Sequence, residues 1–257
     1  MRCPFSADGY SNVIAHARAA GYNLIPMREC AEAGRDIPTM VLRHDVDLSL
    51  DFACEMAAME AGLGVKSTYF ILPHNKYYDP FSTIGARQVR EIVKQGHEIG
   101  LHWDSSIYDE DAKRIRQGFI SDRSRLAEIN GTEIVSASQH IPIDTPYFDV
   151  AELIPFEAYS PAIAERYRYV SDSAMSWRDV TVWDLIDTGI DIQFLAHPVW
   201  WMAEGVALRD KLGTLKAKNP SSLHSTIDAF ADYVERCLAD REHLDDALNI
   251  KWANRKR

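Results

Sequence analysis

The sequence predicts an α/β fold in which parallel strands carry helices on their outer side. Two observations lead to this prediction. Short apolar segments rich in β-branched and aromatic residues alternate along the chain with segments of helical period. Six such strands are predicted between residues 39 and 196, and alternation of this kind is typical of a parallel sheet. Six or seven strand–helix units within 257 residues fit a closed or nearly closed barrel, with an open doubly wound sheet as the alternative.

The predicted elements follow one another without a linker or an internal repeat. We therefore expect one domain over residues 1–257, with core motifs at 41–201 and C-terminal helices at 203–257. Gly62, Gly96 and Gly131 end three of the predicted helices. Strands are predicted at 39–44, 65–72, 97–102, 133–139, 167–171 and 191–196, and helices at 10–20, 51–61, 85–95, 109–130 and after 222.

The charge of the chain argues against two classes of partner. With 38 acidic and 28 basic residues the net charge is −10, so neither nucleic acid nor an anionic membrane is expected as the main partner. The four cysteines lack the spacing of a zinc knuckle or a disulfide framework. The sequence shows no apolar signal region and no stretch of membrane-spanning length, so we expect a cytoplasmic protein.

Acids and histidines gather at the carboxyl ends of five predicted strands. These ends meet at one edge of a parallel sheet, which is where the sites of barrels and doubly wound sheets lie. Five strands ending in this way are more than packing alone explains. The residues are His44, Asp45 and Asp47, then His102 and Asp104, then His140, Asp172 and His197.

Asp45 and Asp47 are separated by one residue, so on an extended strand their side chains share a face. Two adjacent carboxylates are stabilised when a cation lies between them or when one takes a proton. A bound divalent metal ion would stabilise the pair, with one carboxylate as its ligand and the other as a base toward the metal-bound water. Alternatively, Asp47 caps the helix that follows and Asp45 is a loop acid. The spacing alone does not separate these two interpretations.

His102 and Asp104 repeat this spacing, and a nitrogen with a carboxylate suits zinc or a similar first-row metal. A hydrogen-bonded histidine at a strand end is the alternative for His102. For His140 three roles are consistent with the sequence: a metal ligand, a contact to substrate, or a side chain that caps a helix. His44 is expected behind the site residues or in the core, because strand alternation turns its side chain away from Asp45. His97 begins its strand, far from the carboxyl end, and is expected in a structural role.

His197 precedes a proline and two tryptophans, Trp200 and Trp201. This arrangement suits a general acid beside an aromatic wall for a sugar ring, although an aromatic pair is more often core. Asp172 fits a carboxylate that orients a histidine, or else a turn residue.

Taken together and in order, six motifs resemble those of the polysaccharide deacetylase superfamily (NodB-like, carbohydrate esterase family four), and most of all a bacterial branch with Arg-His-Asp-Val-Asp in its first motif. The resemblance implies a distorted, incomplete (β/α) barrel. It also implies metal-dependent hydrolysis of an N-acyl amide, or an O-ester, on a sugar. The motifs are LRHDVD (42–47), STYFIL (67–72), GHEIGLHWD (96–104), SQHIP (138–142), YVSDS (169–173) and FLAHPVWW (194–201).

Carried over by position, the resemblance implies that Asp45 is the catalytic base and Asp47 a metal ligand. His102 is similar to the first histidine of the family's His-x-x-x-His ligand pair. His197 is similar to the late-motif histidine that protonates the leaving amine, and Asp172 to the acid that orients it.

The chain departs from the family pattern in two places. Ser106 stands where the second histidine of the ligand pair is expected, so a third protein ligand must come from elsewhere. His140 is the first choice and Asp104 the next. The motif that usually supplies an arginine to steady the catalytic aspartate is SQHIP here and contains none.

The expected function is therefore that of a metal-dependent amidohydrolase, with Zn²⁺ as the expected cofactor. A small-molecule or glycan substrate loses an acetyl-like N-acyl group, and Trp103, Trp200 and Trp201 are expected to contact it. One alternative is hydrolysis of a non-sugar C–N bond in a ureide or formamide. Another is a degenerate, non-catalytic carbohydrate-binding protein.

Overall fold

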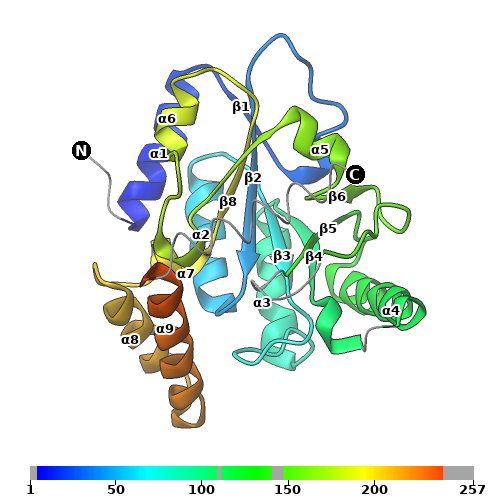
Figure 1. The fold of residues 1–257 in the computed structure, drawn as a ribbon, viewed down its shortest axis with the longest axis vertical. Coiled ribbons are helices and arrows are strands. Elements are labelled where there is room, and N and C mark those ends of the chain that lie inside the picture. The colour runs from blue at the N-terminus through cyan, green and yellow to red at the C-terminus, as the bar shows by residue number, and fades with distance from the viewer. Residues whose placement is uncertain (1–4, 109–110, 141–146, 240–257) are drawn as a thin grey trace.

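In the computed structural model, which describes residues 5–108, 111–140 and 147–239, parallel strands form a single curled sheet (Figure 1). The strand order is β6-β5-β4-β3-β2-β8-β7, and β1 pairs with the first half of β2. No ladder between described residues joins β6 to β7, so the barrel is incomplete, as predicted. The strands are β1 (Asn23–Ile25), β2 (Thr39–Val46), β3 (Thr68–Ile71), β4 (Glu98–Trp103), β5 (Ser136–Gln139), β6 (Phe156–Glu157), β7 (Arg168–Ser171) and β8 (Ile192–Ala196).

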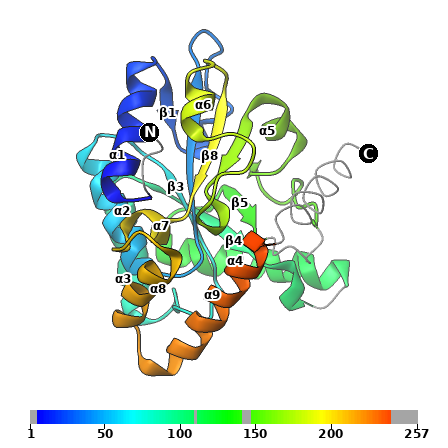
Figure 2. The same ribbon diagram turned by 60° about the vertical axis from the view of Figure 1, so that its left-hand side comes forward.

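Helices surround this sheet, and α8 and α9 pack together near the carboxyl end of β8 (Figures 1 and 2). Ser49 begins α2 by accepting a hydrogen bond from the Phe52 amide, and Gly131 ends α4 with φ +78°. None of the described helices combines the length and the apolar character needed to cross a bilayer. The helices are α1 (Ala7–Ala19), α2 (Leu50–Gly62), α3 (Thr83–Lys94), α4 (Ala112–Asn130), α5 (Pro161–Arg166), α6 (Val182–Ile186), α7 (Pro198–Met202), α8 (Leu208–Ala217) and α9 (His224–Ala239), with short 3₁₀ turns η1 (Met27–Glu29), η2 (Ser105–Tyr108), η3 (Ser173–Met175) and η4 (Ser221–Leu223).

The six predicted strands are all present, although β3 and β5 begin a few residues later than expected. Two strands escaped prediction, because β1 has three residues and β6 only two, too few to show an alternating pattern. Helix α4 begins at Ala112, and residues 109–110 of the predicted helix lie outside the described residues. Residues 141–142 of the SQHIP motif and 240–257 of the C-terminal region also lie outside them.

Strand β2 is buried along its whole length and carries different residues on its two faces. Val41 belongs to the apolar cluster inside the curled sheet, with Phe70, whereas Met40 and Leu42 belong to the larger cluster under the helices. Alternation therefore turns Asp45 toward the interior of the barrel and His44 toward the helices.

On the helix side, Glu60 of α2 accepts hydrogen bonds from the hydroxyls of Tyr10, Ser67 and Tyr69 at 2.5–2.6 Å. His44 Nε2 lies 2.9 Å from the same carboxylate, so His44 is a core residue, as expected. Burial alone would raise the pKa of Glu60, but His44, His97 and the hydrogen bond from Ser67 lower it to about 2.

Candidate active site

A cavity of about 580 Å³ opens at the carboxyl ends of the strands. This is the position that parallel α/β sheets use for their sites. Asp172 lies just behind the wall, fully buried. Most of the side chains predicted from the sequence line the cavity, namely Asp45, Asp47, His102, Asp104, His140, His197 and Trp200.

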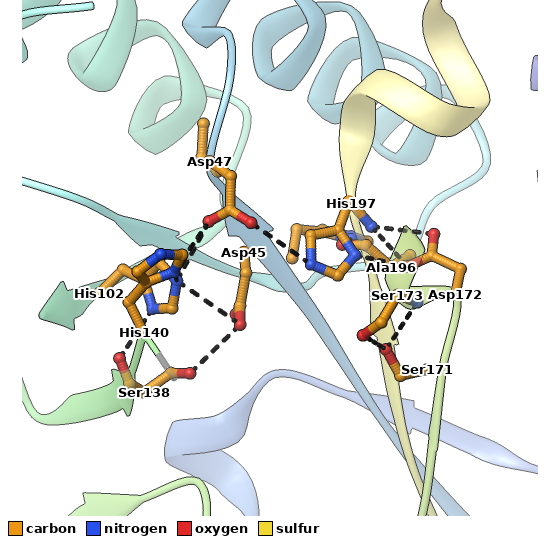
Figure 3. Close-up of polar contacts among 12 residues, drawn as sticks. Asp45, Asp47, His102, Ser138, His140, Ser171, Asp172, Ser173, Ala196 and His197 are labelled. Carbon is orange, nitrogen blue, oxygen red and sulfur yellow. Dashed lines mark hydrogen bonds and ion pairs between the residues drawn. The ribbon is translucent and has the colours of Figure 1, made fainter. Parts of the chain in front are cut away.

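Three of these side chains direct ligand atoms at one point (Figure 3). Asp47 Oδ1 lies 3.1 Å from His102 Nε2 and 3.7 Å from His140 Nδ1. The two ring nitrogens are themselves 3.2 Å apart. Asp47 follows β2, His102 lies in β4 and His140 follows β5, so three parallel strands bring the group together.

The chemistry of this group fits a divalent cation. His102 Nδ1 lies 2.7 Å from the Ser138 carbonyl oxygen, which can only accept, so Nδ1 carries a proton and Nε2 is the ring atom that faces the centre. Asp47 Oδ1 is buried without a hydrogen bond to a described residue. Two nitrogens and one carboxylate oxygen are a donor set that zinc accepts, with a position left for water or substrate.

The pKa shifts of Asp47 and His102 also favour a positive charge at the point where the ligand atoms converge. Burial alone would lower the pKa of His102, but Asp45 and Asp47 raise it. Burial alone would raise the pKa of Asp47, but His102 and His140 lower it well below its ordinary value. At His140 burial is the largest effect, and it lowers the pKa of the ring.

Asp104 and Ser106 do not join this group of ligand atoms. Ser106 donates two hydrogen bonds to Asp104 Oδ1, one from its amide at 2.9 Å and one from its hydroxyl at 2.6 Å. Asp104 is therefore engaged in its own loop, and the histidine after β5 takes the place beside His102.

Asp45 is held by a residue that the sequence analysis missed. The Nη2 atom of Arg43 donates to Asp45 Oδ1 and Oδ2 at 2.9 and 2.8 Å. Burial would raise the pKa of Asp45, but Arg43 and the neighbouring histidines lower it, so the carboxylate is ionised. The signal was the i, i+2 spacing of the two residues, which places both on the interior face of β2.

The barrel interior is built around the Arg43 side chain, which is fully buried. Its Nη1 donates to Gln193 Oε1 at 2.8 Å, and Ser138 Oγ contacts its Nη2. The guanidinium also lies 5.1 Å from the Phe70 ring centre and 4.9 Å from that of Tyr159. These contacts fix the orientation of the group that holds Asp45.

Across the cavity, His197 belongs to a second buried pair. Its Nδ1 lies 2.5 Å from Asp172 Oδ1, and its Nε2 lies 3.5 Å from Asp47 Oδ2 (Figure 3). The Trp201 indole donates to Asp172 Oδ2 at 2.6 Å. Burial would lower the pKa of His197, but Asp172 and Asp47 raise it to about 9, so the ring is protonated at neutral pH.

The three tryptophans expected to contact substrate lie in different places. Trp200 lines the cavity and stacks on Phe230 of α9. Trp103 is 1% exposed and packs against Phe119, on the helix side of β4. Trp201 is also 1% exposed and acts through its hydrogen bond to Asp172. Trp103 and Trp201 are thus core residues rather than part of the cavity wall, because strand and helix periodicity turn them inward.

A scan against protein-family models and a search of curated proteins both find no match. A search of solved structures finds matches of low sequence identity. IcaB from Ammonifex degensii is 16% identical, with 52% of this chain and 66% of its own covered and a TM-score of 0.42, so the chain spans about two thirds of it. The peptidoglycan deacetylase PdaC from Bacillus subtilis is 11% identical (81% and 100% covered, TM-score 0.46). A family 4 acetyl xylan esterase from Clostridium thermocellum, in complex with cobalt, is 16% identical (70% and 82% covered, TM-score 0.41).

Proposed function

We propose that this protein is a metal-dependent hydrolase that removes an acetyl-like N-acyl group from a sugar or glycan precursor. The observation that carries the proposal is the convergence of Asp47, His102 and His140 between two separate proton-transfer groups, Asp45 and His197. Each of these two groups is oriented by a buried partner of its own. A site that only binds a ligand has no need of an oriented base and an oriented acid.

Asp47 Oδ1, His102 Nε2 and His140 Nδ1 are the atoms that would hold the ion, and we propose Zn²⁺ from their chemistry. A divalent ion bound there would act as a Lewis acid toward the amide carbonyl and the attacking water. The proposed roles of Asp45 and His197 concern the protons.

Asp45 is the proposed general base. Its Oδ2 lies 3.8 Å from His102 Nε2, so the carboxylate borders the point at which the ligand atoms converge. Arg43 keeps it ionised and fixed in direction, and Ser138 Oγ lies 3.3 Å from the same oxygen. In this position Asp45 accepts the proton that the attacking water releases.

His197 is the proposed general acid. Asp172 accepts the hydrogen bond from its Nδ1, which leaves the Nε2 proton facing the cavity from the side opposite His102. Because the ring is protonated at neutral pH, it can give this proton to the departing amine. Asp172 is thus a positioning residue and makes no contact with substrate.

Two alanine variants separate these roles. The Asp45→Ala protein should retain one metal ion per chain and lose turnover, whereas the Asp47→Ala protein should lose both. Metal content is measured by elemental analysis and turnover by acetate release from N-acetylated sugars. Asp104→Ala is the matched control, because Asp104 lines the cavity outside the ligand group.

Full metal content in the Asp47→Ala protein would overturn the ligand assignment. Turnover by the Asp45→Ala protein at the wild-type rate would overturn the role of the base. The cytoplasmic location expected from the sequence stays a prediction.

A further inference from the structure

We infer that the substrate carries a phosphate group, which Lys76 and Arg178 hold at the wall of the cavity. The inference rests on the proposed function and names the class of N-acyl sugar that enters the site. Its basis is the placement of two cations and an aromatic surface in one cavity.

The carboxylates of the cavity leave these two cations uncompensated. Asp45 is paired with Arg43, and Asp47 with the histidines of the ligand group. Asp104, the remaining carboxylate among the described lining residues, is hydrogen-bonded within its own loop. Neither Lys76 nor Arg178 forms an ion pair or a hydrogen bond with a described residue. Among the cavity-lining side chains described, both are thus free to bind an anion.

Lys76 projects from a loop that is fastened to the end of β2. The Asn75 side-chain amide donates to the Asp47 carbonyl oxygen at 2.7 Å, and its Oδ1 accepts from the Tyr77 amide at 2.7 Å. The Tyr78 hydroxyl donates to the Val46 carbonyl at 2.5 Å. The backbone of Lys76 is therefore fixed relative to Asp47, and its side chain reaches the cavity from this anchored loop.

The backbone beside Arg178 is anchored by its neighbour in the chain. Arg178 follows Trp177, which is 7% exposed and packs against the rings of Phe194 and Trp201 at 6.1 and 6.3 Å. Trp201 in turn holds the Asp172 carboxylate. Lys76 follows β3 and Arg178 follows β7, so the two residues stand on loops at the same end of the sheet, with β2 and β8 between their strands.

An aromatic surface accompanies the two cations. Tyr77 meets the Phe230 ring edge-on at 6.2 Å, and Trp200 stacks on Phe230 at 6.3 Å with 12° between the ring planes. All three line the cavity. A sugar or a nucleobase packs against such a surface, while the phosphate oxygens accept hydrogen bonds from the ammonium and guanidinium groups.

The charge of the whole chain makes this arrangement specific. At −10 the protein repels anions at long range, so an anionic substrate needs local cations close to the reaction centre. A substrate without a charge gains less from Lys76 and Arg178, because hydrogen bonds from a cation to an anion are stronger than those to a neutral acceptor. The preference for phosphate should weaken as salt rises, because both cations are in contact with solvent.

The test compares three acetylated substrates on the zinc-loaded protein: N-acetylglucosamine, its 6-phosphate, and UDP-N-acetylglucosamine. Acetate release gives kcat/KM for each. We expect either phosphorylated substrate to exceed the neutral sugar by about tenfold or more, the factor of one charge-assisted hydrogen bond. The two phosphorylated arms distinguish a sugar phosphate from a nucleotide sugar. In the Lys76→Ala/Arg178→Ala double variant the ratio should fall toward unity.

Arg87→Ala provides the control, because Arg87 is an exposed cation on α3 outside the cavity and should leave the ratio unchanged. Turnover of the neutral sugar at least as fast as both phosphorylated ones would overturn the inference, as would a ratio that survives the double substitution. If no substrate is hydrolysed, the proposed function fails. Calorimetric binding of the 6-phosphate then decides the inference alone, and equal affinity of wild type and double variant would refute it.

Discussion

Arg43 and Asp45 stand two residues apart on one strand, and one nitrogen of the arginine contacts both carboxylate oxygens of the aspartate. Strand alternation sends both side chains into the barrel interior. The positive charge that stabilises the buried Asp45 thus comes from its own motif. The SQHIP motif, where the resemblance places an arginine, contributes the hydroxyl of Ser138 instead.

Replacing Arg43 by lysine should lower kcat/KM by about 10²-fold or more, because an ammonium is a point charge that cannot reproduce the planar fork of the guanidinium. The pKa of Asp45 should rise once its partner is displaced, so the acidic limb of the pH–rate profile should move to higher pH. Steady-state kinetics between pH 4 and 8 would measure both effects.

Arg43→Met is the companion variant. Its free energy of unfolding should be lower than that of the wild type by about 3–5 kcal/mol, because the substitution leaves a buried carboxylate without its counter-charge. Arg87→Lys on the exposed face of α3 is the control. A lysine variant with wild-type kinetics would show that Arg43 serves packing only.

The order of the elements could be predicted from the sequence because long strands such as β2 and long helices such as α4 carry clear periodicity. The short strand β6 forms on the edge of β5, and β1 forms on residues 39–41 of β2, which β3 does not reach. Such tertiary effects leave no local pattern.

The sequence predicted which residues form the candidate site better than it predicted the contacts that each residue makes. Strand-end positions identified the residues that meet in the cavity, but three-dimensional contacts alone show that Ser106 turns to Asp104. The positions of Trp103 and Trp201 could not be predicted, since an aromatic residue near a strand end can lie in the core or line the cavity. Only the packing of the helices decides between them.

His140→Ala should reduce metal affinity by about 10–100-fold or more, because one of three protein ligand atoms is lost. Asp104→Ala should leave the affinity close to that of the wild type, because its carboxylate bonds to Ser106. Competition with a chelator of known affinity measures both. Equal losses in the two variants would contradict the choice of His140 over Asp104.

The pH dependence of turnover should report on His197. The histidine must be protonated to act as an acid, and its pKa is raised to about 9, so activity should persist to mildly alkaline pH and fall as pH passes that value. Asp172→Asn removes the charge that raises the pKa, so the alkaline limb should move toward neutral pH.

Trp201→Phe tests the pair of His197 and Asp172 without removing its charge, because it removes one hydrogen-bond donor to Asp172 and leaves the carboxylate in place. Its alkaline limb should move much less than that of Asp172→Asn. An alkaline limb unmoved in Asp172→Asn would assign the acid to another group.

The last prediction concerns stability at the buried Glu60. Its pKa falls from about 4.3 in an unfolded chain to about 2 in the folded one, since His44, His97 and the Ser67 hydroxyl stabilise its charge. A lowered carboxyl pKa contributes stability that is complete above the unfolded value and is lost as pH falls toward the folded one, here about 3 kcal/mol. Urea unfolding at pH 7, 5, 4 and 3 should show this loss, and Glu60→Gln should be less stable at pH 7 with a flatter pH dependence. Glu55→Gln, at an exposed position of α2, should keep the wild-type profile. If Glu60→Gln followed that profile too, the carboxylate would have no charged role in the core.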